Sequence, residues 1–203
     1  MNKSNAAILK PGKEKAIRNF HHWIFSGAIQ SLPSFKDGDF LDVFSSSGLF
    51  LGSGYFNRRS GIIGRMLSFD DTPPLLALEK RLESALKLRK EWLKSDQTTA
   101  YRLINGEGDG IPGLVIDIYE QTAVVQCSTK GIDRLKTWII DWLNRHIRPH
   151  TIYEKSLSPS RKEEGMQDEQ KFLFGIENPN LFFRENGLLF TANLTTSQKT
   201  GFF

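Results

Sequence analysis

The chain has 203 residues, of which 39% are hydrophobic and 25% are charged, and its formal net charge is +4. This length allows one large domain or two small ones, each with its own core. The single cysteine, Cys127, excludes an internal disulfide, and no apolar run reaches the roughly 20 residues of a membrane helix. Because residues 1–13 also lack the apolar segment of a signal peptide, we expect a cytoplasmic protein without a membrane partner.

Positive charge is concentrated in the first half of the chain. Residues 1–94 contain 15 Lys and Arg against 9 Asp and Glu, whereas residues 95–203 contain 12 against 14. Uneven positive charge is one signature of nucleic-acid binding, because phosphates attract it whatever the base sequence. A merely solvated surface is the alternative, and the charge taken alone favours that alternative.

Short strands dominate the first 70 residues. A turn at residues 10–12 precedes a short helix predicted over residues 13–20, and an aromatic cluster follows at residues 21–25. Three strand-like runs come next, separated by Gly-, Asn- and Ser-containing turns, at residues 39–44, 49–56 and 62–67. Strands at this spacing indicate a small β-barrel or sandwich.

A helix is predicted directly after Pro73 and Pro74, because two prolines end a strand and suit a helix start. Leucines recur mostly on one face at intervals of three or four residues, and basic residues occupy most of the rest. The expected apolar face consists of Leu75, Leu78, Leu82, Leu86 and Leu93.

Residues 100–192 predict a mixed α+β unit. A strand at residues 101–104 and a glycine-rich loop at 105–113 precede two strands, 114–118 and 122–127, joined by a hairpin. An amphipathic helix is expected over residues 132–147, then a strand at 151–155 and a polar loop at 156–170. Three further strands are predicted, and Asn186-Gly187 is a strong hairpin turn between the last two: residues 172–175, 181–185 and 188–192.

Two glycine-containing segments imitate ligand sites. Gly52-Ser53-Gly54 lacks the third glycine of a dinucleotide loop and is followed by a strand, so a strand crossing or bulge is the better interpretation. The loop beginning at Asn105 resembles the start of a calcium loop, but its twelfth position is Ile116, where a glutamate is required. A tight turn is the better interpretation there.

No set of residues predicts a complete catalytic or metal site. Cys127 ends a strand without a nearby histidine, so we expect a buried apolar residue. His21 and His22 have no matching ligand cluster and are expected to pack beside Trp23. Basic and aromatic residues interleave at strand ends, and either RNA binding or a barrel core with solvated arginines explains them: Tyr55, Phe56, Arg58, Arg59 and Arg65.

Four stretches together resemble one family, the PUA-domain class I methyltransferases that use S-adenosylmethionine to modify cytosine carbon 5 in large-subunit ribosomal RNA. They are residues 21–29 (HHWIFSGAI), 48–60 (GLFLGSGYFNRRS), 105–117 (NGEGDGIPGLVID) and 197–203 (SQKTGFF). His22 departs from the family's proline and Ser197 from its glycine. Each motif alone is weak, but the set spans nearly the whole chain.

The resemblance implies an α+β chain with a PUA-like barrel over residues 1–72, a linking amphipathic helix over 73–94 and a central α+β domain over 95–193. Residues 194–203 would begin a methyltransferase domain whose Rossmann-like part, with its catalytic cysteine, lies beyond Phe203 and is absent. The expected donor-binding residues are Gln198, Lys199, Thr200, Gly201 and Phe202. The expected RNA-binding residues are Lys13, Arg18, His21, Trp23, Tyr55, Asn57, Arg58, Arg59 and Arg65.

Two functional hypotheses follow. In the first, the parent protein is a methyltransferase of ribosomal RNA and this chain is its RNA-binding, catalytically inactive part, with S-adenosylmethionine bound only weakly. The resemblance leaves a homodimer of the parent protein open. In the second, the chain is a free-standing PUA-type RNA-binding adaptor, and replacing Arg58 or Arg59 by alanine is expected to weaken salt-sensitive RNA binding.

Overall fold

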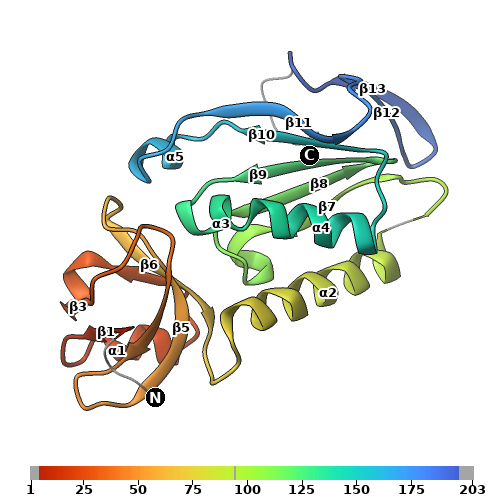
Figure 1. The fold of residues 1–203 in the computed structure, drawn as a ribbon. Coiled ribbons are helices and arrows are strands. Elements are labelled where there is room, and N and C mark those ends of the chain that lie inside the picture. Colours follow the sequence, from red (N-terminus) through yellow and green to blue (C-terminus); the bar gives the residue numbers. More distant parts are fainter. Residues whose placement is uncertain (1–4, 94, 197–203) are drawn as a thin grey trace.

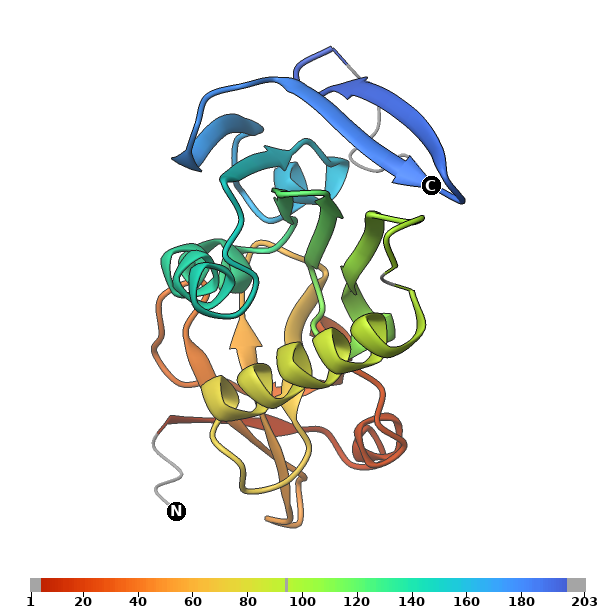
Figure 2. The same ribbon diagram turned by 90° about the vertical axis from the view of Figure 1, so that its right-hand side faces the viewer.

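The computed structural model describes residues 5–93 and 95–196, which build two main sheets and a hairpin (Figures 1 and 2). The first sheet has six strands in the order β2-β6-β5-β4-β1-β3, with only β1 and β4 parallel. Its strands are β1 (Ala6–Leu9), β2 (Trp23–Phe25), β3 (Ile29–Ser31), β4 (Phe40–Phe44), β5 (Phe50–Phe56) and β6 (Ile62–Ser68), accompanied by α1 (Glu14–Arg18) and η2 (Ser26–Ala28).

The six-stranded sheet is curled around its own core. Leu9 of β1 and Ile24 of β2 lie near opposite ends of the strand order, yet both belong to one buried cluster with Leu41 and Val43 of β4. The three strands predicted between residues 39 and 67 are confirmed. The short strands β1 and β3 were not predicted, because three or four residues carry too little alternation to be recognised.

Tight packing explains the two glycines of β5. A Cβ atom on Gly52 would lie 2.1 Å from the Ser68 carbonyl oxygen, and one on Gly54 would lie 2.1 Å from the Arg65 carbonyl oxygen. The pairing register of β5 and β6 also shifts between Ser53 and Gly54. The predicted bulge is therefore confirmed, and β6 fills the space that a nucleotide would need.

The second sheet has five strands in the order β11-β10-β9-β8-β7, with only β9 and β10 parallel. Helices α3 and α4 connect these two parallel strands. The elements are β7 (Ala100–Asn105), η3 (Gly106–Asp109), β8 (Leu114–Tyr119), β9 (Thr122–Cys127), α3 (Lys130–Arg134), α4 (Lys136–His146), β10 (Thr151–Ser156), α5 (Pro159–Glu163) and β11 (Glu169–Gly175).

Two predictions for this unit need correction. The single helix expected over residues 132–147 is two helices, because Leu135 between them has φ −89° and ψ 1°, outside the α-helical range. The polar segment 156–170 is more than a loop, since it contains α5, with Pro159 at the start, and the beginning of β11.

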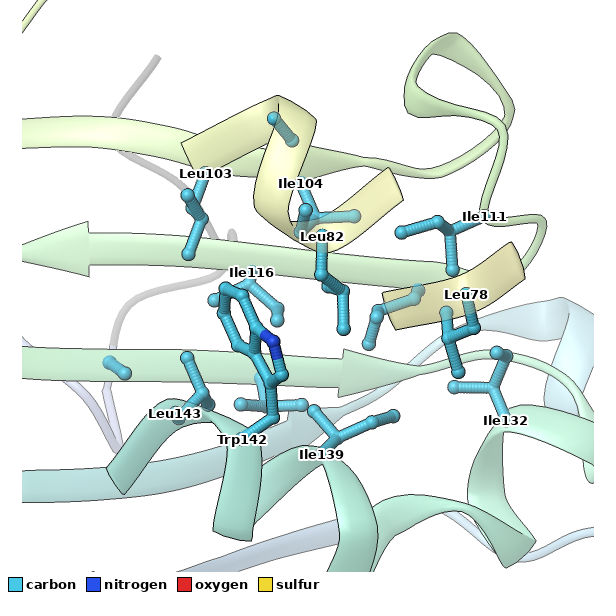
Figure 3. Close-up of a cluster of buried hydrophobic side chains, with 14 of the residues drawn as sticks. Leu78, Leu82, Leu103, Ile104, Ile111, Ile116, Ile132, Ile139, Trp142 and Leu143 are labelled. Carbon is cyan, nitrogen blue, oxygen red and sulfur yellow. The ribbon is translucent and has the colours of Figure 1, made fainter. Parts of the chain in front are cut away.

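Helix α2 (Pro74–Trp92) lies across one face of the five-stranded sheet beside α4. Figure 3 shows Leu78 and Leu82 of α2 and Trp142 of α4 directed into one apolar cluster above the strands. The predicted apolar face is correct in its middle, but Leu75 and Leu93 are exposed because they lie at the two ends of the helix, beyond this cluster.

The other face of this sheet is covered by the hairpin of β12 (Asn180–Glu185) and β13 (Leu188–Asn193). Leu181 and Phe183 pack on Tyr119, Val124 and Tyr153, whose sequence neighbours point to the α2–α4 side. The predicted Asn186-Gly187 turn is confirmed by left-handed φ angles of +49° and +80°.

The described residues form an α+β fold without a doubly wound parallel sheet, since only one strand pair in each main sheet is parallel. No helix among these residues is long and apolar enough to cross a membrane. The residues expected to bind the methyl donor, Gln198 to Phe202, lie outside the described residues.

Candidate nucleic-acid interface

Tyr55 lies inside the molecule, between the two main sheets. Its hydroxyl donates a hydrogen bond of 2.7 Å to the Pro112 carbonyl oxygen and lies 3.0 Å from Thr129 Oγ1. Burial raises the pKa of Tyr55 far above its ordinary value, so the phenol stays protonated. The side chain is fully buried and has no surface with which to stack on a base.

Asn57 and Arg65 are also turned inward, onto Glu164 beyond α5. The Asn57 amide donates to the Glu164 carboxylate at 2.7 Å and to its carbonyl oxygen at 2.9 Å. The Arg65 guanidinium lies 2.8 Å from the other carboxylate oxygen, and both charged side chains are buried. A charge pair in this setting needs such additional hydrogen bonds to offset its loss of hydration.

The prediction that Tyr55, Asn57 and Arg65 face RNA is therefore corrected. The three side chains connect the six-stranded sheet to the region of the five-stranded sheet, and that region covers them. The sequence could not distinguish these cases, because an arginine or tyrosine at a strand end has the same local pattern whether it faces solvent or a neighbouring domain.

Arg58 and Arg59 are exposed, but they differ in freedom. The Arg58 guanidinium donates to the carbonyl oxygens of Phe35 at 2.7 Å and Pro33 at 2.8 Å, and it stacks 3.6 Å from the centre of the Phe35 ring. Arg59 keeps 68% of its side chain exposed and lies 3.8 Å from Asp37. Arg58 thus braces the segment before β4, and Arg59 is the more available cation.

The other four predicted RNA-binding residues gather at one edge of the six-stranded sheet. Lys13, His21 and Trp23 line a pocket of about 390 Å³ between α1 and β2, which we call the α1–β2 groove. Arg18 is exposed on α1 beside it. The wall of the groove also includes Leu9, Ala16, Ile17, Ile24, Phe25, Gly27 and Ala28.

The short strand β2 explains why aromatic rings meet in this groove. Alternation along the strand turns Ile24 into the core and leaves Trp23 and Phe25 on the outer side. The two rings meet edge to face with centroids 6.3 Å apart, and His21 approaches Trp23 in the same way at 6.0 Å. The Trp23 backbone N–H also donates to His21 Nδ1 at 3.1 Å.

Lys13 lines the groove together with these rings, and further cations lie on and before α1. Lys10, Lys13, Lys15 and Arg18 are all exposed, and the Lys10 ammonium donates to the Gly27 carbonyl oxygen at 3.1 Å across the groove. Aromatic faces stack on unpaired bases, and ammonium and guanidinium groups neutralise phosphates. The groove therefore has the chemistry of a site for single-stranded RNA.

The sequence reasoning missed two residues of this region. Phe25 belonged to the noted aromatic cluster, and its position two residues after Trp23 was the signal that both share one face. Glu107 accepts a hydrogen bond of 2.8 Å from Trp23 Nε1, although 84 residues separate the two in the chain. No local pattern could have revealed that contact.

The structure also bears on the interpretations of Cys127, the two histidines and the loop at Asn105. Cys127 is fully buried, as expected. His21 packs on Trp23, but the same expectation is wrong for His22, which lies 2.8 Å from the Met66 carbonyl oxygen and packs on Phe69. Asp109 of the calcium-like loop pairs with Arg89, and Gly110 has a left-handed φ of +71° that suits a tight turn. Residues 5–93 and 95–196 contain no cluster of three or more side chains suited to a metal ion.

Comparison with known proteins gives this geometry a context. Residues 7–69 match the PUA-like domain family. The chain is 34% identical to ribosomal RNA large subunit methyltransferase I of Alteromonas mediterranea over 204 residues, covering 98% of the chain and 51% of the relative. The corresponding protein of Vibrio parahaemolyticus is 34% identical over 203 residues with the same coverage.

Solved structures show the same fold. A Streptococcus mutans protein described as a SAM-dependent methyltransferase matches with a TM-score of 0.75 and 21% identity, covering 92% of this chain and 48% of that one. The structure of SMU.776, complexed with SAH, matches with a TM-score of 0.76 and 22% identity, covering 92% and 47%. Residues 7–69 are thus similar to a PUA-like domain, and the chain spans about half the length of the curated methyltransferases that it matches.

Proposed function

We propose that this chain is the RNA-binding portion of an S-adenosylmethionine-dependent methyltransferase of large-subunit ribosomal RNA, acting in the cytoplasm. The observation that carries the proposal is the α1–β2 groove, which combines the half-buried Trp23, the exposed Phe25 and the exposed Lys13 within the residues that match a PUA-like domain. Similarity over 98% of the chain to ribosomal RNA methyltransferases supports the substrate class.

In this proposal the groove binds RNA next to the modified nucleotide. Trp23 and Phe25 supply faces on which unpaired bases stack, and Lys13 and Arg18 neutralise the phosphates that follow. Fixing the RNA relative to the methyl donor supplies orientation, which is a large part of what an enzyme contributes to a reaction between two bound molecules.

The methyl donor itself is assigned by resemblance. S-adenosylmethionine supplies the methyl group when bound, and Gln198 to Phe202, outside the described residues, are proposed to border its pocket. Among the described residues, the glycine pair of β5 does not fit a nucleotide, because Ser68 and Arg65 backbone atoms occupy the space.

Methylation at cytosine carbon 5 is the finer part of the proposal and rests on the family motifs. That reaction uses a cysteine thiolate, which attacks carbon 6 and activates carbon 5. Cys127 is unsuited to this role, since it is fully buried and its pKa is raised by burial and by Glu154. The nucleophile is proposed to lie in another part of the parent enzyme.

RNA affinity measured as a function of salt tests the proposed groove. We expect Trp23→Ala to weaken binding of a large-subunit rRNA fragment by about five- to a hundredfold, because one stacked base contributes about 1–3 kcal/mol. Lys13→Ala and Arg18→Ala should each weaken binding and lower the salt slope by about one. Fluorescence anisotropy at several salt concentrations provides both numbers.

The matched control is Lys87→Ala, which removes one exposed charge from α2 and lies outside the groove. It should leave both affinity and salt slope nearly unchanged. Arg58→Ala should also have a smaller effect than Lys13→Ala, because the Arg58 guanidinium is engaged with Phe35 and Pro33. Equal losses for all four basic variants would argue against a defined groove.

A free-standing RNA-binding adaptor is the second candidate, favoured by the fact that the groove is built entirely from residues of the six-stranded sheet region. The reading frame after the codon for Phe203 separates the two. An in-frame segment with a glycine-rich strand-to-helix turn and a cysteine motif supports the methyltransferase, whereas a stop codon supports the adaptor.

A further inference from the structure

Trp23 of the α1–β2 groove contacts the part of the molecule that contains the five-stranded sheet. Trp23, on β2, donates its indole N–H to Oε1 of Glu107, which belongs to η3 after the first strand of the five-stranded sheet. The donor–acceptor distance is 2.8 Å, well within hydrogen-bonding range. An indole has only this one N–H donor, so the contact defines which way the ring is turned.

Helix α2 holds the η3 segment in place. The Arg89 guanidinium makes two hydrogen bonds of 2.7 Å to the Asp109 carboxylate, and both side chains are nearly buried. Asp109 also accepts the backbone N–H of Asn105 at 2.7 Å, which closes the loop on itself. Arg81, which precedes Arg89 on α2, donates to the Gly110 carbonyl oxygen. Glu107 is thus presented to Trp23 from a braced loop.

The negative charge of Glu107 is unexpected at a site that binds RNA. Glu107 is an exposed carboxylate that contacts a groove lined by Lys13, and Lys10, Lys15 and Arg18 are exposed on and before α1. A negative charge there repels phosphates, so electrostatics alone disfavours it at an RNA site. Its hydrogen bond to the Trp23 indole is the contact that gives this carboxylate a role at the groove.

We propose that Glu107 is a positioning residue, which fixes the Trp23 indole as a stacking platform for an unpaired base of the RNA. The RNA site is therefore a composite of both structural units, with the ring on one and its support on the other. This inference rests on the proposed RNA-binding function and adds a role for a residue outside the PUA-like domain.

Two substitutions at Glu107 separate positioning from charge. Glu107→Ala removes both the charge and the acceptor, and we expect RNA affinity to fall about two- to tenfold, the effect of one hydrogen bond. Glu107→Gln removes the charge but keeps an amide oxygen that accepts the indole N–H. Its affinity should equal or exceed that of the unmodified chain. If Glu107→Ala binds RNA as tightly as the unmodified chain or more tightly, the inference is wrong.

Trp23→Phe provides the double-mutant control, because it keeps an aromatic ring and removes the donor. In that background Glu107→Ala should no longer weaken RNA binding, since no hydrogen bond remains to be lost. Glu83→Ala, an exposed acidic position on α2, removes a charge without contacting Trp23 and should bind RNA at least as well as the unmodified chain. A loss with Glu83→Ala equal to that with Glu107→Ala would contradict the inference.

A measurement without RNA keeps the inference separate from the proposed function. The indole N–H resonance of Trp23, assigned by its loss in Trp23→Phe, should move upfield in Glu107→Ala and stay near its position in Glu107→Gln. An unchanged resonance in Glu107→Ala would overturn the positioning role. Failure of the unmodified chain to bind RNA would instead overturn the proposed function.

Discussion

Cys127 illustrates how one buried side chain settles a chemical question. It is the last residue of β9, its backbone N–H donates to Ser156 Oγ at 3.0 Å, and its side chain is fully buried. Burial is the larger cause that raises the pKa of its thiol, and the nearby Glu154 carboxylate adds to it. Because a group with a raised pKa stays protonated up to that value, the thiol remains neutral well above pH 7.

We expect Cys127 to be unreactive toward a thiol reagent such as DTNB in the folded protein at pH 8. The thiolate is the reacting species, so native labelling should be at least about a hundredfold slower than labelling in denaturant. Raising the pH to 9, where an ordinary thiol ionises, should speed native labelling little. Cys127→Ala supplies the baseline, and rapid native labelling that follows a pKa near 8.5 would contradict the assignment.

At this scale the sequence predicted some residues well and others poorly. The burial of Cys127 and the turn glycines near Asn105 followed from local strand and loop patterns, and the structure confirms them. Tyr55 and Arg65 were misplaced because their environment is set by Thr129 and Glu164, which are far away in the chain. Side chains whose partners are distant in sequence leave no periodic signal.

Helix α2 shows the corresponding logic for a whole element. Its 19 residues contain a clear leucine period, and the middle of its apolar face packs on the five-stranded sheet as that period predicts. From the resemblance, this helix was expected to link the PUA-like barrel to the central α+β domain. The helix contacts both β6 and β7, and its buried leucines belong to the cluster that the two main sheets share. It is therefore part of the core common to both sheets.

Two leucines of α2 offer a matched pair for a stability test. We expect Leu82→Ala to lower the free energy of unfolding by about 2–5 kcal/mol, because Leu82 is fully buried and its loss leaves a cavity. Leu75→Ala, on the same helix but 40% exposed, should change it by less than about 1 kcal/mol. Urea denaturation followed by circular dichroism gives both values, and similar losses would contradict the assigned faces.

Predictability of elements followed their length. The long helix α2 and most strands of five or more residues, such as β5 and β8, were expected from their patterns and are confirmed, although the start of β11 was expected to be a loop. Strands β1 and β3 and helix α5 have three to five residues and depend on pairing or packing supplied by other segments. The break between α3 and α4 at Leu135 could not be predicted, because neither proline nor glycine occupies that position.

At the scale of the whole molecule, the six-stranded and five-stranded sheets share one buried core. Tyr55 and Leu67 of the first sheet belong to the same buried cluster as Leu82 of α2 and Trp142 of α4. Asp39 of the segment before β4 pairs with Arg134 of α3 at 2.6 Å, at the edge of this contact. A shared core predicts that the two sheets unfold together in one cooperative transition.

Gly131 of α3 provides the sharpest test of that shared core. An added Cβ atom would lie 2.1 Å from Tyr55 Cγ, so Gly131→Ala must displace either the Tyr55 side chain or α3. Alanine in place of glycine normally stabilises a helix by about 0.5–1 kcal/mol. Here we expect the opposite sign, a loss of about 1–3 kcal/mol from overpacking.

The control is Gly27→Ala in η2, where an added Cβ atom meets nothing within 4 Å. It should leave the thermal midpoint nearly unchanged, whereas Gly131→Ala should lower it by several degrees while the transition stays single. Stabilisation by Gly131→Ala would mean that Tyr55 does not pack against α3. Two separate transitions in the unmodified chain would mean that the sheets fold independently, and then the Trp23–Glu107 contact would join two bodies free to move relative to each other.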